Sequence, residues 1–106
     1  MSRDRRRAEN EAAFRAINES IAALGRRYGT QALEFVCECS DPDCTERVSL
    51  TGAAYERVRA EATYFLVVTG HEAAGIERVV RREPTFSIVE KGGEAAEVAA
   101  STDPRP

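Results

Sequence analysis

Apolar residues recur at helical spacing through the first part of the chain. The recurring residues are Phe14, Ile17, Ile21, Leu24 and Tyr28. Their steps of three and four residues are typical of one face of an α-helix, so they predict a helix over residues 4–27. Ser2 or Asp4 can cap its start, and Gly29 is placed at the C′ position after its end. We expect the apolar stripe to pack on the protein's own sheet.

Two short apolar runs predict a β-hairpin after this helix. Leu33–Cys37 and Arg47–Leu50 have the composition of strands. The segment between them contains Asp41, Pro42 and Asp43, which favour turns through backbone geometry and local hydrogen bonding. The hairpin tip therefore falls at residues 38–44.

The second half of the chain predicts a short helix and three more strands. Thr51 is a favourable N-cap, and Tyr64–Val68 is a continuous apolar run, typical of a central strand that is buried on both faces. Ile76–Arg82 and Thr85–Lys91 flank Pro84 and predict a further hairpin. The order α-β-β-α-β-β-β indicates an α+β fold with mostly antiparallel strands.

The two ends of the chain differ in composition from the predicted domain. Residues 1–8 are rich in arginine, which opposes the dipole of a helix start, so we expect a frayed basic arm. Gly92-Gly93 interrupts the last strand, and the small, polar residues that follow predict a disordered tail over residues 93–106. Residues 9–92 then form a single domain, which a chain of 106 residues accommodates.

Charge and composition narrow the functional classes. The net charge of −3 argues against a bulk basic surface for coating nucleic acid, so we expect nucleic-acid binding to be weak or absent. No apolar run approaches a membrane span, and the N-terminus lacks the apolar region of a secretory signal. We therefore expect a cytoplasmic protein without a membrane partner, in which thiols stay reduced.

The chemistry of the chain is concentrated in four residues. All three cysteines and the only histidine are Cys37, Cys39, Cys44 and His71. Three thiols within one short turn are poorly explained as buried small side chains, and together with one imidazole they form a Cys3His set, one of the common ligand sets of structural zinc. The sequence therefore predicts one Zn2+ per chain, with His71 delivered by the loop after Tyr64–Val68 and the hairpin stapled to the core.

Other metal chemistry remains open at this point. If His71 is not a ligand, Asp41, Asp43, Glu72 or water can take the fourth position. A [2Fe–2S] cluster with Cys3His ligation is an alternative that thiolate ligands permit, but the spacing around Cys44 fits it poorly because no histidine follows closely.

The pattern does not favour an enzyme. His71-Glu72 lacks the second histidine of a zincin, and Pro42-Asp43-Cys44 lacks the second cysteine of a zinc deaminase. Four protein ligands leave no open position for an activated water. No nucleophile has a histidine partner, since the only imidazole belongs to the predicted metal site.

Several short motifs resemble those of a group of small actinobacterial proteins with a Cys-x-Cys-x4-Cys…Gly-His-Glu pattern. The matching motifs are Phe14-Arg15, Asn18-Glu19-Ser20-Ile21, Phe35-Val36-Cys37-Glu38-Cys39, Cys44, Leu50-Thr51, Tyr55-Glu56, Val58-Arg59, Gly70-His71-Glu72, Glu77-Arg78-Val79-Val80 and Val89-Glu90-Lys91. The resemblance implies that the three cysteines and His71 belong to one pattern, and it transfers no activity. Thr69 departs from the proline expected before Gly70, a change that affects only the stiffness of the loop.

These observations favour a small non-enzymatic zinc protein that acts as a protein-interaction or regulatory module. One alternative is a nucleic-acid-binding zinc module, supported by the arginines of residues 3–7, by Arg26-Arg27, and by Arg78, Arg81 and Arg82. Another is a thiol redox or metal sensor, in which oxidation of the thiolates releases the metal.

Overall fold

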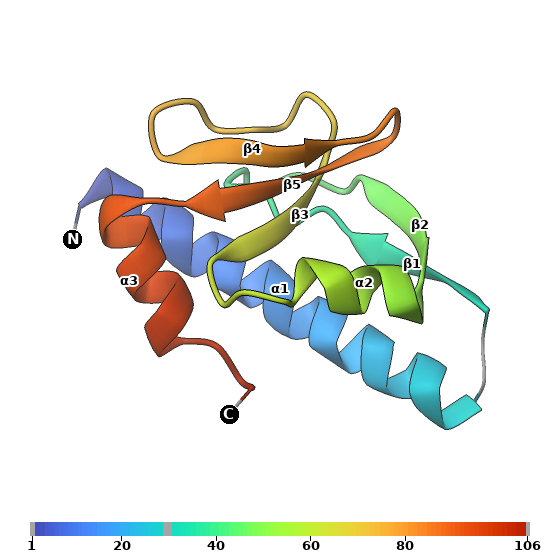
Figure 1. The fold of residues 1–106 in the computed structure, drawn as a ribbon. Coiled ribbons are helices and arrows are strands. Elements are labelled where there is room, and N and C mark those ends of the chain that lie inside the picture. Colours follow the sequence, from blue (N-terminus) through green and yellow to red (C-terminus); the bar gives the residue numbers. More distant parts are fainter. Residues whose placement is uncertain (1, 29–30, 106) are drawn as a thin grey trace.

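The computed structural model describes residues 2–28 and 31–105, and it confirms the predicted α+β fold with its hairpin and three further strands (Figure 1). The elements in chain order are α1 (Arg3–Tyr28), β1 (Ala32–Val36), β2 (Arg47–Thr51), α2 (Gly52–Val58), β3 (Tyr64–Val68), β4 (Glu77–Arg82), β5 (Phe86–Lys91) and α3 (Gly93–Ser101). Gly29, expected after the first helix, and the Tyr28 side chain lie outside the described part.

The strands form two antiparallel sheets. β1 pairs with β2, with Phe35 opposite Val48, and the other sheet has the order β3-β5-β4. The prediction that Tyr64–Val68 is a central strand is wrong, because β5 lies at the centre and β3 at the edge. A continuous apolar run indicates that a strand is buried on both faces, but it does not indicate which strands pair with it.

The core lies between the hairpin, α2 and β3. The rings of Phe35 and Tyr55 stack with their centroids 4.4 Å apart, and Val58 and Leu66 are fully buried beside them. Thr51 begins α2 as predicted, because its side chain accepts a hydrogen bond from the Ala54 N–H at 3.1 Å. α1 runs beneath this layer along the length of the molecule (Figure 1).

The face of α1 that points into the protein is not the apolar stripe. The buried positions are Ala8, Glu11, Arg15, Asn18, Ala22 and Gly25. The expected packing of the stripe is only partly found, because Ile17 and Leu24 are 47% and 55% exposed. Polar side chains can occupy the inner face because the fold supplies partners; the Arg15 guanidinium, for example, donates to the carbonyls of Ala62 and Ala99 at 2.7 and 2.8 Å.

The predicted disordered tail is a helix in the structure, so this prediction is corrected. α3 packs against the start of α1, where Ala95 and Val98 form a buried cluster with Ala8. Gly92, which we interpreted as the end of order, is instead the N-cap of α3, and Gly93 follows with a positive φ of 55°. Alanine has the highest helix propensity and allows close helix packing, which explains why such a small-residue segment is ordered.

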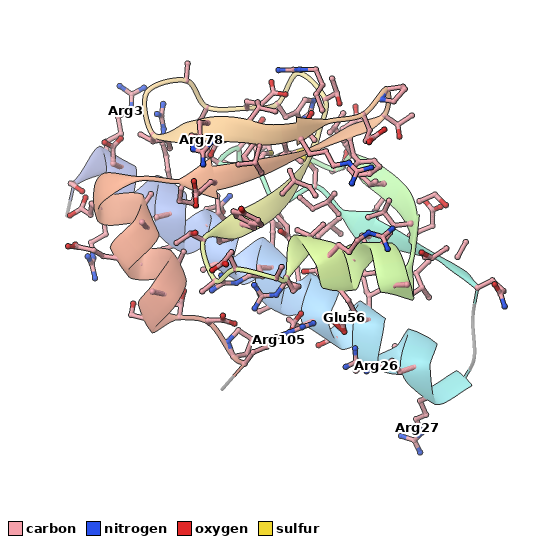
Figure 2. The ribbon with its side chains drawn as sticks, viewed as in Figure 1. Arg3, Arg26, Arg27, Glu56, Arg78 and Arg105 are labelled. Carbon is pink, nitrogen blue, oxygen red and sulfur yellow. The ribbon has the colours of Figure 1, made fainter. Side chains whose placement is uncertain are left out.

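The ends of the chain are held by charged contacts. Arg59 pairs with Glu19 and Asp103, and Arg105 reaches both Glu19 and Glu56 beside α1 (Figure 2). At the other end, α1 is already helical from Arg3, whereas residues 1–8 had been expected to fray. The α3 contact at Ala8 provides the tertiary packing that this arginine-rich turn lacks on its own.

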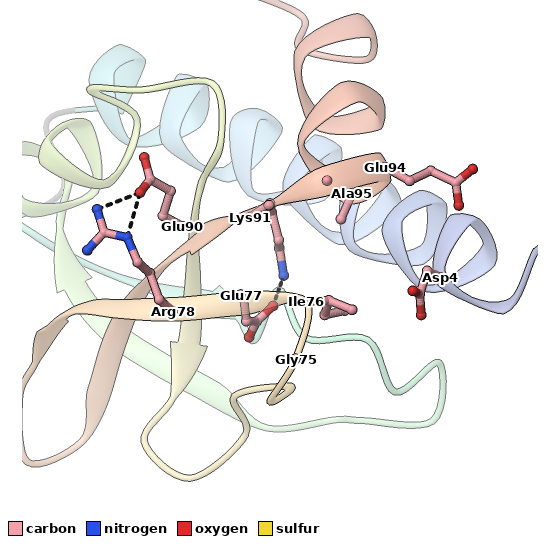
Figure 3. Close-up of a pocket in the computed structure, with 11 residues that line it drawn as sticks. Asp4, Gly75, Ile76, Glu77, Arg78, Glu90, Lys91, Glu94 and Ala95 are labelled. Atoms are coloured by element: carbon pink, nitrogen blue, oxygen red, sulfur yellow. Dashed lines mark hydrogen bonds and ion pairs between the residues drawn. The ribbon is translucent and has the colours of Figure 1, made fainter.

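A buried ionic group joins α1 to the three-stranded sheet. The Lys91 ammonium contacts Glu11 at 2.5 Å and also pairs with Glu77, as Figure 3 shows for the second contact. Lys91 and Arg15 lie over the Phe65 ring, with 5.0 and 4.7 Å from the charged groups to its centroid. These contacts fix how the sheet sits on α1.

Candidate metal centre

The four predicted ligands come together where the hairpin meets the end of β3. Cys37 and Cys39 follow β1 directly, Cys44 precedes β2, and His71 follows β3. Their ligand atoms, three sulfurs and one imidazole nitrogen, all lie within 4.8 Å of one another. The structure thus brings together every residue of the predicted set, and the group can hold a metal ion.

An extended Cys-Glu-Cys segment positions the first two thiols. Alternate side chains of an extended chain point to opposite sides, so Cys37 and Cys39 share one side and Glu38 takes the other. The Glu38 N–H donates to the Leu66 carbonyl at 2.7 Å, and the Glu38 carboxylate accepts the Leu66 N–H at 2.8 Å. The segment is therefore attached to the outer edge of β3.

Two tight turns bring in the other ligands. The Cys44 N–H donates to the Asp41 carbonyl at 3.1 Å, closing a turn in which Pro42 supplies a favourable φ. The His71 N–H donates to the Val68 carbonyl at 2.9 Å. Gly70 precedes His71 with a φ of 101°, a conformation that glycine adopts without steric cost.

Two of the separations between ligand atoms are close to those of a tetrahedral metal site. The Nδ1 atom of His71 lies 3.6 Å from the sulfurs of both Cys37 and Cys44. With Zn–S near 2.3 Å and Zn–N near 2.05 Å, tetrahedral angles place sulfur and nitrogen about 3.6 Å apart. Nδ1 is thus the imidazole atom that faces the thiols of Cys37 and Cys44, at a separation that a shared metal ion could bridge.

Each sulfur is also approached by a backbone N–H. The Val68 N–H donates to the Cys37 sulfur at 3.2 Å. Hydrogen bonds from the N–H groups of Asp41 and Glu46 favour the thiolates of Cys39 and Cys44. Such donors stabilise sulfur in its charged form, which is the form that binds metal.

The thiols do not ionise independently. A hydrogen bond from Cys37 lowers the pKa of the Cys39 thiol to about 5, and the same bond raises the pKa of Cys37, as burial does too. Burial also raises the pKa of Cys44. The shared hydrogen bond and burial thus favour the protonated form of Cys37, and burial favours that of Cys44. A bound cation would favour the deprotonated form of all three.

The site is buried on one side and open on the other. Cys37 and Cys39 are buried, whereas Cys44 and His71 are partly exposed. A hollow of about 320 Å3 lies against the site and is lined by Cys39, Ser40, Asp41, Gly70, His71 and Glu72. An ion held here is accessible from the solvent through this hollow.

The acidic residues considered as substitute ligands have other contacts. Asp41 accepts the Asp43 N–H at 2.9 Å within the turn. Glu72 accepts from the Gly70 N–H at 3.2 Å and from Arg82 at 3.1 Å. These bonds stabilise the two loops that carry the ligands.

Glu38 is the residue of the site whose role the sequence did not reveal. Glu38 lies in the same segment as the exposed residues Asp41 and Asp43, yet it is fully buried. Its carboxylate accepts from Tyr55 OH at 2.6 Å and Asn18 Nδ2 at 2.8 Å, in addition to the Leu66 N–H. Burial raises its pKa, and the three donors oppose that shift. Its position between two cysteines in an extended segment was the available signal.

Two further hollows, both beside the start of α1, are also lined by charged side chains. One of about 590 Å3 separates Arg3, Arg6 and Arg7 from the turn at Ser40–Pro42. The other, of about 460 Å3, lies between the β4–β5 hairpin and the starts of α1 and α3 (Figure 3). The Lys91 ammonium in this hollow is paired with the carboxylates of Glu11 and Glu77. It therefore forms a structural ion pair and is not a reactive group.

The chain matches no protein-family model, no curated protein and no solved structure. Within residues 2–28 and 31–105, no helix combines the length and apolar character needed to cross a lipid bilayer. The functional argument therefore depends on the geometry of the Cys3His cluster.

Proposed function

We propose that this protein is a small non-enzymatic zinc-binding module, in which Cys37, Cys39, Cys44 and His71 hold one Zn2+ as a structural ion. The observation that carries the proposal is the clustering of all four ligand atoms within 4.8 Å. The ligands come from the hairpin and from the end of β3, so the ion would join two sheets that share few backbone hydrogen bonds. Metal binding would then contribute directly to folding.

The geometry favours a single ion over a [2Fe–2S] cluster. A two-iron cluster divides its protein ligands between two metals, which separates them into two pairs. Here Nδ1 of His71 is equally distant from the sulfurs of Cys37 and Cys44, at 3.6 Å from each. One central ion accounts for this arrangement, and Cys3His is a frequent zinc ligand set.

A protein-interaction or regulatory role in the cytoplasm is the biological reading that this site supports best. Four protein ligands complete the coordination of zinc and leave no position for substrate. The turn at the site exposes Asp41 and Asp43, so the metal would hold a rigid acidic protrusion in place. Such a surface suits a basic protein partner, since charge complementarity speeds association and improves selectivity.

Native mass spectrometry of protein purified without added metal tests the zinc proposal. We expect one zinc per chain, and we expect Cys39→Ser to lose it. Asp43→Asn is the matched control, because this exposed residue lies in the same turn and should leave the metal in place. Iron with acid-labile sulfide, or a metal content that Cys39→Ser does not change, would contradict the proposal.

The exposure of Cys44 supports a second candidate, a thiol redox sensor. Cys44 is the least buried of the three cysteines, and oxidants can reach the site through the adjoining hollow. Oxidation of Cys44 would remove one ligand and weaken the attachment of the turn. Zinc release should then follow peroxide addition and reverse with a thiol reductant, whereas release that only chelators produce would favour a purely structural ion.

A further inference from the structure

Arginines line one wall of the hollow that separates the start of α1 from the turn at Ser40–Pro42. This hollow, of about 590 Å3, is the largest of the three described above, and its helical wall carries Arg3, Arg6 and Arg7. Arg6 and Arg7 follow Arg3 by three and four positions, so the three residues are neighbours on one side of the helix. We call this cavity the arginine hollow.

The three arginines of the hollow have no carboxylate partner within residues 2–28 and 31–105. Arg5, on the same turn of the helix, differs from them, because its guanidinium pairs with Glu9 at 3.5 Å. Asp4 lines the other hollow, between the β4–β5 hairpin and the starts of α1 and α3 (Figure 3). Like charges that converge without a counter-charge repel one another, and a bound anion would offset that repulsion.

The facing wall leaves these arginines available for a ligand. Asp41 is the acidic residue that lines it, and the carboxylate of Asp41 accepts the Asp43 N–H at 2.9 Å inside the turn. Asn10 joins the two walls, because its Nδ2 donates to the Cys39 carbonyl at 3.4 Å. This bond holds the turn beside α1 without using a guanidinium group.

We propose that the arginine hollow binds a small molecule with a diphosphate or triphosphate group. Guanidinium groups donate paired N–H bonds that match phosphate oxygens, and such charge-assisted bonds are stronger than neutral ones. Three neighbouring guanidinium groups suit several linked phosphates, and the hollow has the size of ordinary small-molecule pockets. None of the residues that line the hollow is one of the four proposed metal ligands, so this site goes beyond the structural ion.

The surrounding charges favour a short polyanion over a nucleic-acid strand. Asp41 and Asp43 are exposed in the facing turn and would repel phosphates that continue past the hollow. The net charge of the chain is −3, and Arg78 and Arg82 on β4 are already paired with carboxylates. A ligand that ends within the hollow gains the attraction of the three arginines without this repulsion.

Isothermal titration calorimetry of the protein as purified tests the site, with tripolyphosphate and ATP as probes in about 50 mM salt to limit screening. We expect both probes to bind saturably, because the phosphates carry the recognition. Arg6→Gln and Arg7→Gln should each weaken binding about tenfold, the effect of removing a hydrogen-bonded charge. Arg5→Gln is the matched control, because it removes the same charge from the same turn but outside the hollow, and it should leave the affinity unchanged.

Three results would overturn this assignment. One is the absence of saturable binding up to about 1 mM of either probe. Another is an equal loss of affinity in Arg5→Gln and Arg6→Gln, which would show general charge attraction only. The third is tighter binding of a single-stranded oligonucleotide than of tripolyphosphate. Native mass spectrometry of the same samples reports whether zinc is present and stays bound, so failure of the zinc proposal is distinguished from failure of the phosphate site.

Discussion

Glu38 and Leu66 exchange two hydrogen bonds, one between their backbones and one from the Leu66 N–H to the Glu38 carboxylate. This exchange joins the Cys-Glu-Cys segment to β3 and thereby sets where two of the three thiols point. A buried carboxylate is an expensive residue to place in a small protein. Here its donors are supplied by three separate elements, which makes Glu38 an organising residue of the candidate metal centre.

Removing the Glu38 side chain should weaken both the fold and the metal site. Glu38→Ala leaves the Leu66 N–H and the Tyr55 hydroxyl without their buried acceptor, so we expect a loss of about 2–4 kcal/mol in the free energy of unfolding. Zinc affinity should fall about tenfold, as for other residues that orient metal ligands. Urea denaturation and competition with a zinc chelator measure the two effects. Glu34→Ala, an exposed glutamate of β1, is the control, and equal behaviour of the two variants would contradict the role of Glu38.

Glu11 should make stability depend on pH. Burial raises its folded-state pKa from 4.5 to about 7, and attraction to Lys91 offsets only part of that shift. The protonated form is therefore favoured by folding, and the stability that it contributes is complete below pH 4.5 and lost as the pH rises through 7. As the pH rises across this interval, the free energy of unfolding of Glu11→Gln should increase relative to that of wild type by up to about 3 kcal/mol.

The measurement for Glu11 is denaturant unfolding of wild type and Glu11→Gln at several values between pH 4.5 and pH 8. Taking the difference between the two proteins at each pH cancels the titration of the thiols, which both share. Glu9→Gln, an exposed change on the same helix, should show a constant difference from wild type. A constant difference for Glu11→Gln as well would contradict the assignment.

Removal of α3 should be far more harmful than loss of a disordered tail. A chain that ends at Gly92 loses the Ala99 carbonyl and the Thr102 hydroxyl that accept from the buried Arg15, and it exposes Ala8. Leaving a buried charge without its acceptors predicts a loss of about 3–5 kcal/mol. Thermal unfolding measures the effect. Glu97→Gln, on the exposed side of α3, should be neutral, and a truncated chain as stable as wild type would show that α3 is dispensable.

Binding to generic DNA or RNA should be weak at physiological salt. The net charge is −3, and several arginines are already paired with carboxylates, among them Arg59, Arg78 and Arg82. Arg3, Arg6 and Arg7 remain beside the turn at Ser40–Pro42, so any residual binding should fall steeply with added salt. Fluorescence anisotropy with labelled oligonucleotides measures this. Submicromolar, sequence-dependent binding that survives raised salt would favour the nucleic-acid module instead.

The ligand set could be predicted because its residue types leave few alternatives. Every cysteine and the only histidine fitted one Cys3His group, and the structure places the four residues together. The strands and α2 could also be predicted from the sequence. Thr51 and the apolar runs are local signals for these elements, and the tertiary structure agrees with them. These parts of the fold depend on local sequence, which explains their agreement with the prediction.

The remaining features depend on partners distant in sequence. Arg15 and Asn18 are inner residues of α1 only because carbonyls of Ala62, Ala99 and Val36 receive their hydrogen bonds. The spacing of apolar residues cannot indicate such hydrogen bonds. The inner face predicted for α1 was therefore rotated about the helix axis from the observed one. α3 was not predicted for a similar reason. Its small residues are ordered because they pack on Ala8, which is distant in sequence.

The attachment of the Cys37–Cys39 segment along β3 also bears on how the protein avoids self-aggregation. β4 forms one margin of the three-stranded sheet, where a bulge at Val80 and the charges of Arg81 and Arg82 discourage unwanted strand pairing. β3 has no such charges, since Phe65, Leu66 and Val67 are all apolar. Its margin is protected by the cysteine segment itself. Under the zinc proposal, loss of the ion would loosen this segment at Cys37 and Cys39 and leave the Glu38–Leu66 hydrogen bonds to hold it alone. The apolar edge of β3 would then be easier to expose, which would favour edge-to-edge assembly of the protein.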